Sequence, residues 1–255
     1  MQTIGIIAQK GGTGKTTTAA ALWGMFTGEG RRVLAVDMDP QGSLSLIAGS
    51  KGTPGKSLVQ ALTGKIPARD VIEHTEHGDL IPAEMMLTAA DKILSGSVTA
   101  LKSALAPLAN DYDYAILDAP PGLGILLLNV LTAADWIVIP VQADLLSLNG
   151  LTQIAETVAQ VRARTNPALR VAGVLLSRHN ARSRITRAAT AQVLALAARL
   201  EMPVFRAAIR ETVIIREAQT VQQPLDKYAP RAAVTEDLKS FAAELLERMK
   251  GAQKA

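Results

Sequence analysis

The chain has 255 residues, enough to bury a large core, and its 27 basic and 23 acidic residues give a net charge of +4. It has no cysteine, which excludes disulfides, thiolate nucleophiles and cysteine-ligated zinc or iron–sulfur sites. Its apolar runs are shorter than the roughly 18 residues of a membrane span, and its first residues predict a strand rather than a signal peptide, so we expect a cytoplasmic protein.

The positive charge is concentrated in the second part of the chain. Residues 1–150 carry 10 basic and 14 acidic side chains, whereas residues 151–255 carry 17 and 9. Residues 161–216 alone contain 11 arginines, no lysine and two acids. This asymmetry suits a polyanionic partner, although charge alone leaves an ordinary solvated surface as an equal alternative.

Apolar segments alternate with helical ones along the chain. Runs rich in β-branched and aliphatic residues predict buried strands at 3–9, 32–39, 78–83, 114–122, 135–142 and 170–177. Helical composition falls between and after them, at 16–28, 84–109, 124–133, 148–164, 183–200 and 232–250. Strands that are apolar on both faces and alternate with helices predict a mostly parallel sheet covered by helices on both faces, so we expect one α/β domain over residues 1–255.

The first predicted strand runs into a glycine-rich loop, "AQKGGTGKTT" at 8–17. This loop matches the phosphate-binding P-loop only in part, because the pattern that ends in Gly-Lys-Thr at 14–16 requires a glycine at position 9. The chain has Gln9 there instead, followed by an additional lysine, Lys10. Since the loop follows a strand and opens a helix, a nucleotide site remains the strongest interpretation.

Each part of this loop has a chemical role in such a site. Successive backbone N–H groups can wrap phosphate oxygens, and the start of the following helix adds its positive end. Lys15 would contact the β- and γ-phosphates, and the Thr16 hydroxyl would bind magnesium. The loop residues expected to bind nucleotide are Lys10, Gly11, Gly12, Thr13, Gly14, Lys15, Thr16 and Thr17.

Three aspartates follow the next strands of the predicted sheet. Asp37 and Asp39 end the strand at 32–39, where one could orient the attacking water and the other could support magnesium. Asp118 ends the strand at 114–122, as a Walker B aspartate does when it holds magnesium through water. A turn-forming role for Asp39 and a helix-capping role for Asp118 are the structural alternatives. Together with Thr16, these three aspartates form the predicted metal site.

Four stretches, in chain order, resemble the ParA/Soj family of deviant-Walker P-loop ATPases, which partition plasmids, chromosomes and other cargo. They are "KGGTGKTT", the Walker A′ segment "VLAVDMDPQGS" at 33–43, "DYAILDAPPGLGILLLNVLTAADWIVIPVQ" at 113–142 and "GVLLSRHN" at 173–180. The resemblance covers most of the chain and implies ATP and Mg²⁺ as cofactors. Because the loop lies so close to Met1, we expect no N-terminal DNA-binding domain like that of larger plasmid relatives.

The resemblance also implies roles for single residues. Lys10 matches the lysine that crosses a dimer interface to the partner's nucleotide, so ATP would hold two copies together as a sandwich dimer. Asp39 matches the water-positioning aspartate, and Thr17 matches a hydroxyl that contacts nucleotide. The predicted catalytic residues are Lys10, Lys15 and Asp39, and the predicted γ-phosphate switch consists of Asp118, Pro120, Pro121 and Gly122.

Family members bind double-stranded DNA without sequence preference as ATP dimers, and a ParB-like partner stimulates hydrolysis. The basic region at about 178–216 would therefore face DNA and place the protein on the nucleoid. Its candidate residues are Arg178, Arg182, Arg184, Arg187, Arg210 and Arg216. The chain departs from the family here, because "AIRETVIIREAQ" puts Glu211 where the family has an arginine and leaves Arg210 as a neighbouring substitute.

Two alternatives remain open. MinD-like ATPases share the deviant loop but bind membranes through a C-terminal amphipathic helix. In this chain the apolar stripe of the last predicted helix, Leu238, Phe241, Leu245 and Met249, favours packing against the core, so we expect no membrane binding. The second alternative is a metabolic P-loop enzyme of the same superfamily that transfers phosphate to a small substrate.

Overall fold

A computed structural model describes residues 1–180 and 183–252. Within these residues, eight strands form one sheet in the order β3-β4-β2-β5-β1-β6-β7-β8. All neighbouring strands pair in parallel except β3 and β4, which form an antiparallel hairpin at one edge. The strands are β1 Gln2–Ile6, β2 Val33–Asp37, β3 Glu73–Thr75, β4 Gly78–Ile81, β5 Tyr114–Asp118, β6 Trp136–Val141, β7 Arg170–His179 and β8 Val204–Arg210.

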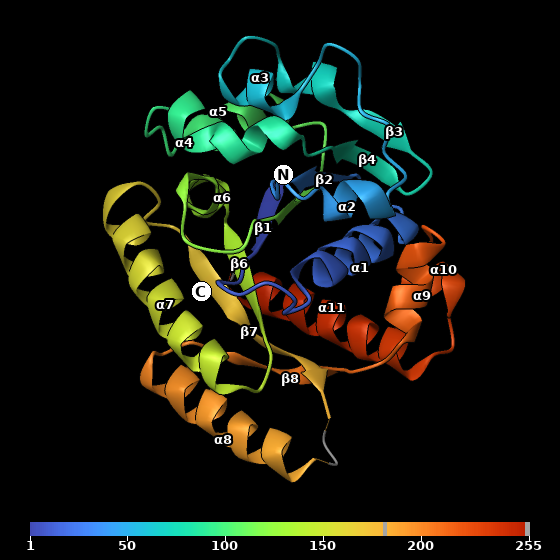
Figure 1. Cartoon of the computed structure of the whole chain (residues 1–255), viewed down its shortest axis with the longest axis vertical. Helices are drawn as coiled ribbons and strands as arrows, with labels where there is room; N and C mark the ends of the chain where they lie inside the picture. The colour runs from blue at the N-terminus through green and yellow to red at the C-terminus, as the bar shows by residue number, and fades with distance from the viewer. Residues whose placement is uncertain (181–182, 253–255) are drawn as a thin grey trace.

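Helices lie on both faces of this sheet. Figure 1 shows α3, α4 and α5 on the side of β3 and β4, and α7 and α8 on the side of β7 and β8. The helices are α1 Lys15–Gly28, α2 Ser43–Ile47, α3 Leu58–Leu62, α4 Ala90–Ile93, α5 Ala100–Leu105, α6 Ile125–Ala133, α7 Leu145–Arg164, α8 Arg184–Arg199, α9 Ile214–Thr220, α10 Leu225–Tyr228 and α11 Ala233–Gly251, with 3₁₀ turns at Ala68–Val71, Met85–Ala89 and Ala106–Leu108. The predicted architecture of a mostly parallel sheet covered on both faces is confirmed.

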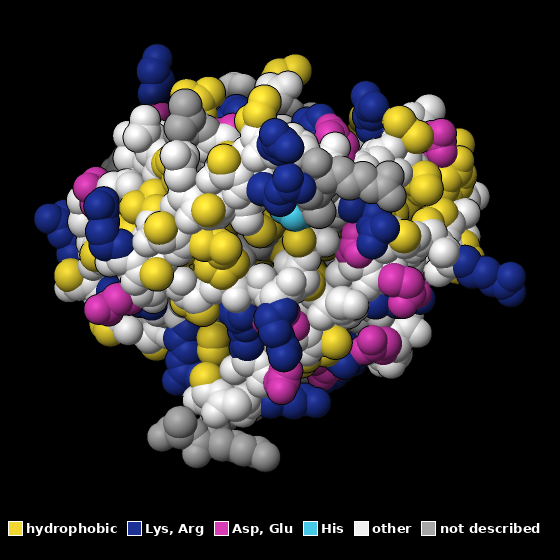
Figure 2. All heavy atoms as spheres, turned by 90° about the horizontal axis from the view of Figure 1, so that it is seen from below, with side chains coloured by type: hydrophobic (Ala, Val, Ile, Leu, Met, Phe, Trp, Pro, Cys, Tyr) yellow, Lys and Arg dark blue, Asp and Glu magenta, His cyan; other side chains and the backbone are white. Residues whose placement is uncertain are grey.

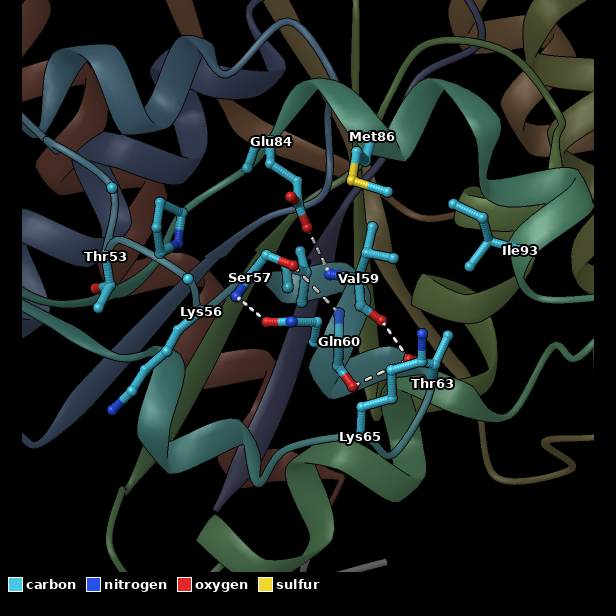
Figure 3. Close-up of a pocket in the computed structure, with 15 residues that line it drawn as sticks. Thr53, Lys56, Ser57, Val59, Gln60, Thr63, Lys65, Glu84, Met86 and Ile93 are labelled. Atoms are coloured by element: carbon cyan, nitrogen blue, oxygen red, sulfur yellow. Dashed lines mark hydrogen bonds between the residues drawn. The ribbon is translucent and has the colours of Figure 1, made fainter.

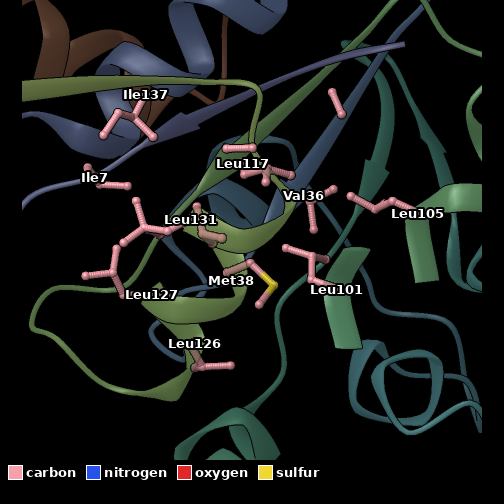
Figure 4. Close-up of a cluster of buried hydrophobic side chains, with 14 of the residues drawn as sticks. Ile7, Val36, Met38, Leu101, Leu105, Leu117, Leu126, Leu127, Leu131 and Ile137 are labelled. Atoms are coloured by element: carbon pink, nitrogen blue, oxygen red, sulfur yellow. The ribbon is translucent and has the colours of Figure 1, made fainter. Parts of the chain in front are cut away.

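Two hydrophobic clusters lie on opposite faces of the sheet. One contains side chains of α3, α5, α6 and α7, and Figure 4 shows its centre, where Leu101, Leu127 and Leu131 meet Val36 and Met38. The other lies under α1 and α11. Strands that are buried on both faces require such covering, which explains the apolar runs in the sequence.

The last helix contributes its apolar stripe to the second cluster. Leu238, Phe241, Leu245 and Met249 are all buried, and the Phe241 ring meets that of Phe205 edge-on at 4.9 Å. The stripe is therefore core, as the sequence predicts. None of the helices in the described residues is long and apolar enough to cross a membrane.

The predicted secondary structure differs from the observed one in several places. The expected helical segment 84–109 is divided into short helices, because Ser95 (φ 47°) and Gly96 (φ 81°) adopt left-handed backbone conformations that end the helical path. The structure also contains β3 and β8, at places where we expected no strand, and Arg210 is the last residue of β8. β8 is half-exposed: Phe205 and Ile209 face the core while its arginines face solvent.

The strand order places the chemically important strand ends side by side. β5 lies between β1 and β2, so Asp118 is the register partner of both Ile6 and Asp37. β6 and β7 continue the sheet on the other side of β1. The P-loop, the aspartates and the ends of β6 and β7 therefore lie at one carboxyl edge, where ligands bind in open α/β sheets.

Candidate nucleotide and magnesium site

The glycine-rich loop has the backbone conformation of an anion-binding loop. Gly12 (φ 76°) and Gly14 (φ 87°) are in the left-handed region that side chains disfavour. A Cβ added at Gly11 or Gly12 would meet nothing within 4 Å, so the space beside the loop is open. The loop ends at Lys15, the first residue of α1, whose N-terminus adds a favourable field for an anion.

The carbonyl groups of the loop are tied back to the protein. The amide of Gln142 donates to the Gly12 carbonyl (2.6 Å), and the hydroxyl of Ser177 donates to the Thr13 carbonyl (2.6 Å). Within α1, the Thr18 hydroxyl donates to the Gly14 carbonyl (2.8 Å). Because these donors hold successive carbonyls, they restrict the conformation of the loop, which favours anion binding by reducing the freedom lost on binding.

Lys15, Thr16 and Thr17, which follow these glycines, differ in burial and in their contacts. Lys15 is buried at the start of α1, whereas Thr16 is partly exposed. Thr17 accepts a hydrogen bond from the Gln219 amide of α9 (3.2 Å) and borders a small hollow between α1 and α9. These positions agree with contacts to nucleotide by all three residues, which stay predictions.

Asp37 is held in a fixed orientation by Ser45, a residue that sequence reasoning missed. One carboxylate oxygen accepts from both the Ser45 N–H (2.8 Å) and its hydroxyl (2.7 Å), and the other accepts from the Asp39 N–H (3.2 Å). Burial raises the pKa of Asp37 to about 6, although these hydrogen bonds lower it in part. Asp37 is thus an oriented carboxylate that lacks a compensating positive charge.

Asp118 is the clearest candidate for a metal-binding group. It is completely buried, and neither of its carboxylate oxygens has a hydrogen-bond donor within 3.5 Å among the described residues. Burial and, to a smaller extent, the charge of Asp37 raise its pKa to about 8, while the Thr16 hydroxyl and the Lys15 ammonium offset part of that rise. Buried ionised carboxylates are costly unless a cation compensates them. These oxygen donors fit Mg²⁺, which prefers carboxylates, hydroxyls and water.

Asp39 lies at the start of the turn that follows β2. Its carboxylate accepts from the Gln41 N–H (3.0 Å), and its carbonyl accepts from the Gly42 N–H (2.8 Å). The turn-forming role is therefore present, and it fixes a buried carboxylate near Asp37. A fixed carboxylate can also orient a water molecule, so the predicted catalytic role stays a prediction.

The predicted switch segment contacts the P-loop directly. After β5, the Ala119 N–H donates to the Ile6 carbonyl (3.2 Å) and the Gly122 N–H donates to the Gln9 carbonyl (2.9 Å). The two prolines between them, Pro120 and Pro121, donate no backbone hydrogen bond. A shift of this segment would therefore move the start of the loop, which is the arrangement a γ-phosphate sensor needs.

Lys10 forms an ion pair within its own chain. Its ammonium lies 2.9 Å from a carboxylate oxygen of Asp144, the N-cap residue of α7. Although burial raises the pKa of Asp144, hydrogen bonds from Lys10 and from the Ser147 N–H lower it below its usual range. The Lys10 side chain is 38% exposed, so it lies at the mouth of the loop, accessible to a second molecule.

The predicted DNA-facing arginines lie in different environments. Arg178 pairs with Glu211 (2.6 Å), and Arg210 pairs with Asp237 of α11 (2.6 Å), so both are neutralised locally. Figure 2, which looks onto the side of α8, shows Lys and Arg side chains in several separate groups among acidic and hydrophobic ones.

The other four arginines divide by location. Arg184 and Arg187 are exposed on the first turn of α8, where Ser183 caps the helix by accepting from the Thr186 N–H. Arg216 is exposed on α9, and Arg182 lies outside the described residues. Arg184 and Arg187 thus lie exposed at the N-terminus of α8, a position that suits contacts with phosphate groups.

Comparisons with known proteins agree with this geometry. A family model described as an AAA domain matches residues 1–171. The chromosome-partitioning ATPase Soj of Thermus thermophilus is 35% identical over 249 residues, covering 98% of this chain and 97% of Soj. The sporulation initiation inhibitor protein Soj of Bacillus subtilis is 36% identical over 248 residues, covering 95% and 97%.

Two solved structures share the whole fold. The first is named cobyrinic acid a,c-diamide synthase, from Mycobacterium smegmatis with bound ADP and magnesium; it is 33% identical with a TM-score of 0.85 and covers 99% of this chain and 96% of its own. The second is a McdA variant from Cyanothece in complex with ATP, 26% identical with a TM-score of 0.88, covering 97% and 96%. Both hold an adenine nucleotide.

Proposed function

This chain belongs to the ParA/Soj family of P-loop ATPases, and we propose that it positions a cellular cargo by forming an ATP sandwich dimer that binds DNA. It is an ATPase, and its cofactors are ATP and Mg²⁺. The observation that carries the proposal is the position of Lys10, an accessible cation at the mouth of a preformed phosphate loop.

The residues divide the chemistry of hydrolysis among them. Backbone N–H groups of residues 11–14 and the Lys15 ammonium bind the phosphates, while Thr16 and Asp118 hold magnesium, with Asp37 beside them. The metal, when bound, neutralises charge that develops on the transferred phosphoryl group. Asp39 orients the attacking water. Lys10 of a second copy adds the positive charge that one chain cannot place over its own nucleotide.

Exposed apolar side chains support the dimer. Leu123, which follows the switch, is 37% exposed, and Leu146, at the start of α7, is 63% exposed. Leu146 and Lys10 border the same hollow, and Gly122, next to Leu123, is hydrogen-bonded to Gln9. Apolar side chains around a site are typical of a surface that a partner covers. A second copy on this edge would bury both leucines and bring its Lys10 to the nucleotide.

The dimer provides a reason for nucleotide-dependent DNA binding. Two copies double the number of arginines that can meet the DNA backbone, and contacts of this kind are sequence-independent and weaken with salt. We assign the contacts to Arg184 and Arg187 first and to Arg216 second. A ParB-like partner bound to the cargo, acting through a short basic segment, stimulates hydrolysis and releases the dimer from the nucleoid.

The test is DNA binding by the purified protein with ATP, with ADP, and as Asp39→Ala held in ATP, across a salt series. We expect binding to unrelated duplexes only with ATP, retained by Asp39→Ala and abolished by Lys10→Ala. Binding should fall linearly with the logarithm of salt concentration. If duplexes bind equally well with ADP or without nucleotide, or do not bind in any state, the proposal is wrong.

A metabolic enzyme is the second candidate, supported by the likeness to the structure named cobyrinic acid a,c-diamide synthase. In that case phosphate release would depend on a small carboxylic acid and would not change with DNA. Measuring phosphate release against a panel of small acids, with and without DNA, separates the two functions.

A further inference from the structure

A second cavity lies at the same edge of the sheet as the nucleotide site, next to the end of β4. It has a volume of about 520 Å³ and opens between the loop 52–57 and the segment 82–86 that follows the strand (Figure 3). None of the P-loop residues or the three aspartates borders it. Its size is within the usual range of ligand sites.

The charge on one side of this cavity is uniformly positive. Residues 51–66 contain three lysines, Lys51, Lys56 and Lys65, and no acid. Lys56 and Lys65 border the cavity, and both are exposed. In Figure 3, Lys56 extends away from the centre along one side. One oxygen of the Glu84 carboxylate on the cavity wall accepts from the Val59 N–H (2.8 Å), which holds this acid toward α3 without removing its charge. A negatively charged ligand would therefore meet two lysines and one acid, a net positive charge.

The backbone around this cavity is unsuited to a small anion such as phosphate. The N–H groups at the start of α3 already have side-chain acceptors: that of Ser57 donates to Gln60 (3.1 Å), and that of Gln60 donates to Ser57 (3.3 Å). With the Val59 N–H also paired, these groups cannot form a phosphate cradle. An anionic ligand can therefore contact only the lysine ammonium groups. These groups are on flexible side chains, so they can adjust to the acidic side chains of a polypeptide.

The opposite side of the cavity is apolar and exposed. Met85 is 78% exposed and Met86 is 57% exposed, and Met86 borders the cavity together with Ile93. Figure 3 shows Met86 and Ile93 on the side away from Lys56. Methionine side chains adapt to different partners and recur at protein-binding surfaces. Lys56 and Lys65 on one side and Met86 with Ile93 on the other suit a segment that carries both acidic and aliphatic side chains.

We propose that this cavity binds an acidic, leucine-containing segment of a partner protein. The occupant is opposite in charge to the basic segment expected to stimulate hydrolysis, so it belongs to a second class of partner. Its carboxylates pair with Lys56 and Lys65, and its aliphatic side chains pack between Met86 and Ile93.

The cavity wall is connected to the catalytic edge by two hydrogen bonds. The Ala83 N–H donates to the Ser45 hydroxyl (2.9 Å), and that hydroxyl donates to Asp37 (2.7 Å). A segment that moves residues 82–86 would shift Ser45 and thereby the orientation of Asp37. Docking therefore changes the rate of ATP hydrolysis.

The first experiment measures binding of a fluorescein-labelled peptide of repeated Glu-Glu-Leu units to the full-length protein with Mg·ADP, by fluorescence anisotropy. We expect the double variant Lys56→Glu/Lys65→Glu to bind at least about ten-fold more weakly, a change of about 1.4 kcal/mol. Lys250→Glu, a single charge reversal on the distant α11, should change the affinity by less than about two-fold. A repeated Gln-Gln-Leu peptide should bind at least about ten-fold more weakly than the acidic one.

Each other outcome overturns the proposal. Absence of binding, equal binding of the neutral peptide, or an equal loss in Lys250→Glu removes the charge argument. A larger loss in Arg184→Glu places the peptide on α8 instead, and displacement by millimolar glutarate indicates a small-molecule site. In a second readout, the peptide should alter ATP turnover of the unmodified protein but not of Lys56→Glu/Lys65→Glu. The binding test requires neither DNA nor hydrolysis, so its failure is independent of that of the partition function.

Discussion

Removing the hydroxyl of Ser177 tests whether the P-loop is shaped in advance by its neighbours. This hydroxyl is buried and lies 2.6 Å from the Thr13 carbonyl and 3.0 Å from that of Val141. Ser177→Ala leaves the Thr13 carbonyl without this donor, and an unsatisfied buried group costs about 1–3 kcal/mol. For a chain of this size, each kcal/mol lowers the melting temperature by about 2–4 °C.

Nucleotide affinity shows whether the Ser177 hydroxyl maintains the binding conformation of the loop or only adds to the stability of the fold. In Ser177→Ala, part of the binding energy of ADP would be used to order the loop. If this ordering costs about 1.4 kcal/mol, the affinity for ADP falls about ten-fold. The assay is isothermal titration calorimetry with Mg·ADP, which avoids hydrolysis. Thr190→Val is the matched control, because its hydroxyl is buried without a hydrogen-bond partner among the described residues. An ADP affinity of Ser177→Ala within two-fold of the unmodified protein, despite a lower melting temperature, would refute the reasoning.

Two further predictions concern charges at the same edge. Asp144→Asn keeps a capping side chain on α7 but removes the ion pair with Lys10. The proposed dimer breaks one such pair in each copy, and each exposed pair contributes less than about 1 kcal/mol, so ATP-dependent dimerisation measured by analytical ultracentrifugation should strengthen up to about 30-fold; weaker dimerisation would contradict it. The raised pKa values of Asp37 (about 6) and Asp118 (about 8) mean that the nucleotide-free folded state holds protons which the unfolded chain releases near pH 4. The free energy of unfolding of this state should therefore fall as the pH rises from about 4 to about 8. In Asp118→Asn, the melting temperature should change less with pH between about 6 and about 8. If its dependence on pH is unchanged in this variant, Asp118 does not titrate in that range.

The sequence predicts the parts of this site that depend on local pattern. The P-loop, Asp37 and Asp118 all lie where a strand ends, and strand ends follow from short apolar runs whose carboxyl ends meet at one edge. Two of the secondary-structure errors have local causes. β8 alternates buried and exposed residues instead of forming an apolar run, and the break at Ser95 depends on a left-handed conformation that non-glycine residues seldom adopt.

The supporting contacts could not be predicted in the same way. Ser177 and Thr13 are 164 positions apart, and Lys10 and Asp144 are 134 apart, so only the folded sheet brings each pair together. Ser177 ends a predicted strand, which gave a weak signal that it faces the catalytic edge. Ser45 gave none, because serine after a loop is common and its bond to Asp37 depends on how α2 lies against β2.

The ion pair of Lys10 with Asp144 is compatible with the proposed role of this lysine in a dimer. Both partners are about one-third exposed, and pairs of this kind contribute less than about 1 kcal/mol, so breaking the contact requires little energy. In a closed dimer the same ammonium would meet the negative charge of a nucleotide in a site from which water is excluded, where electrostatic attraction is several-fold stronger. In the proposed dimer, the difference between the two environments would favour transfer of Lys10 from Asp144 to the opposite nucleotide, more strongly with ATP than with ADP. Loss of the γ-phosphate would reduce that charge and so favour return of the lysine to Asp144.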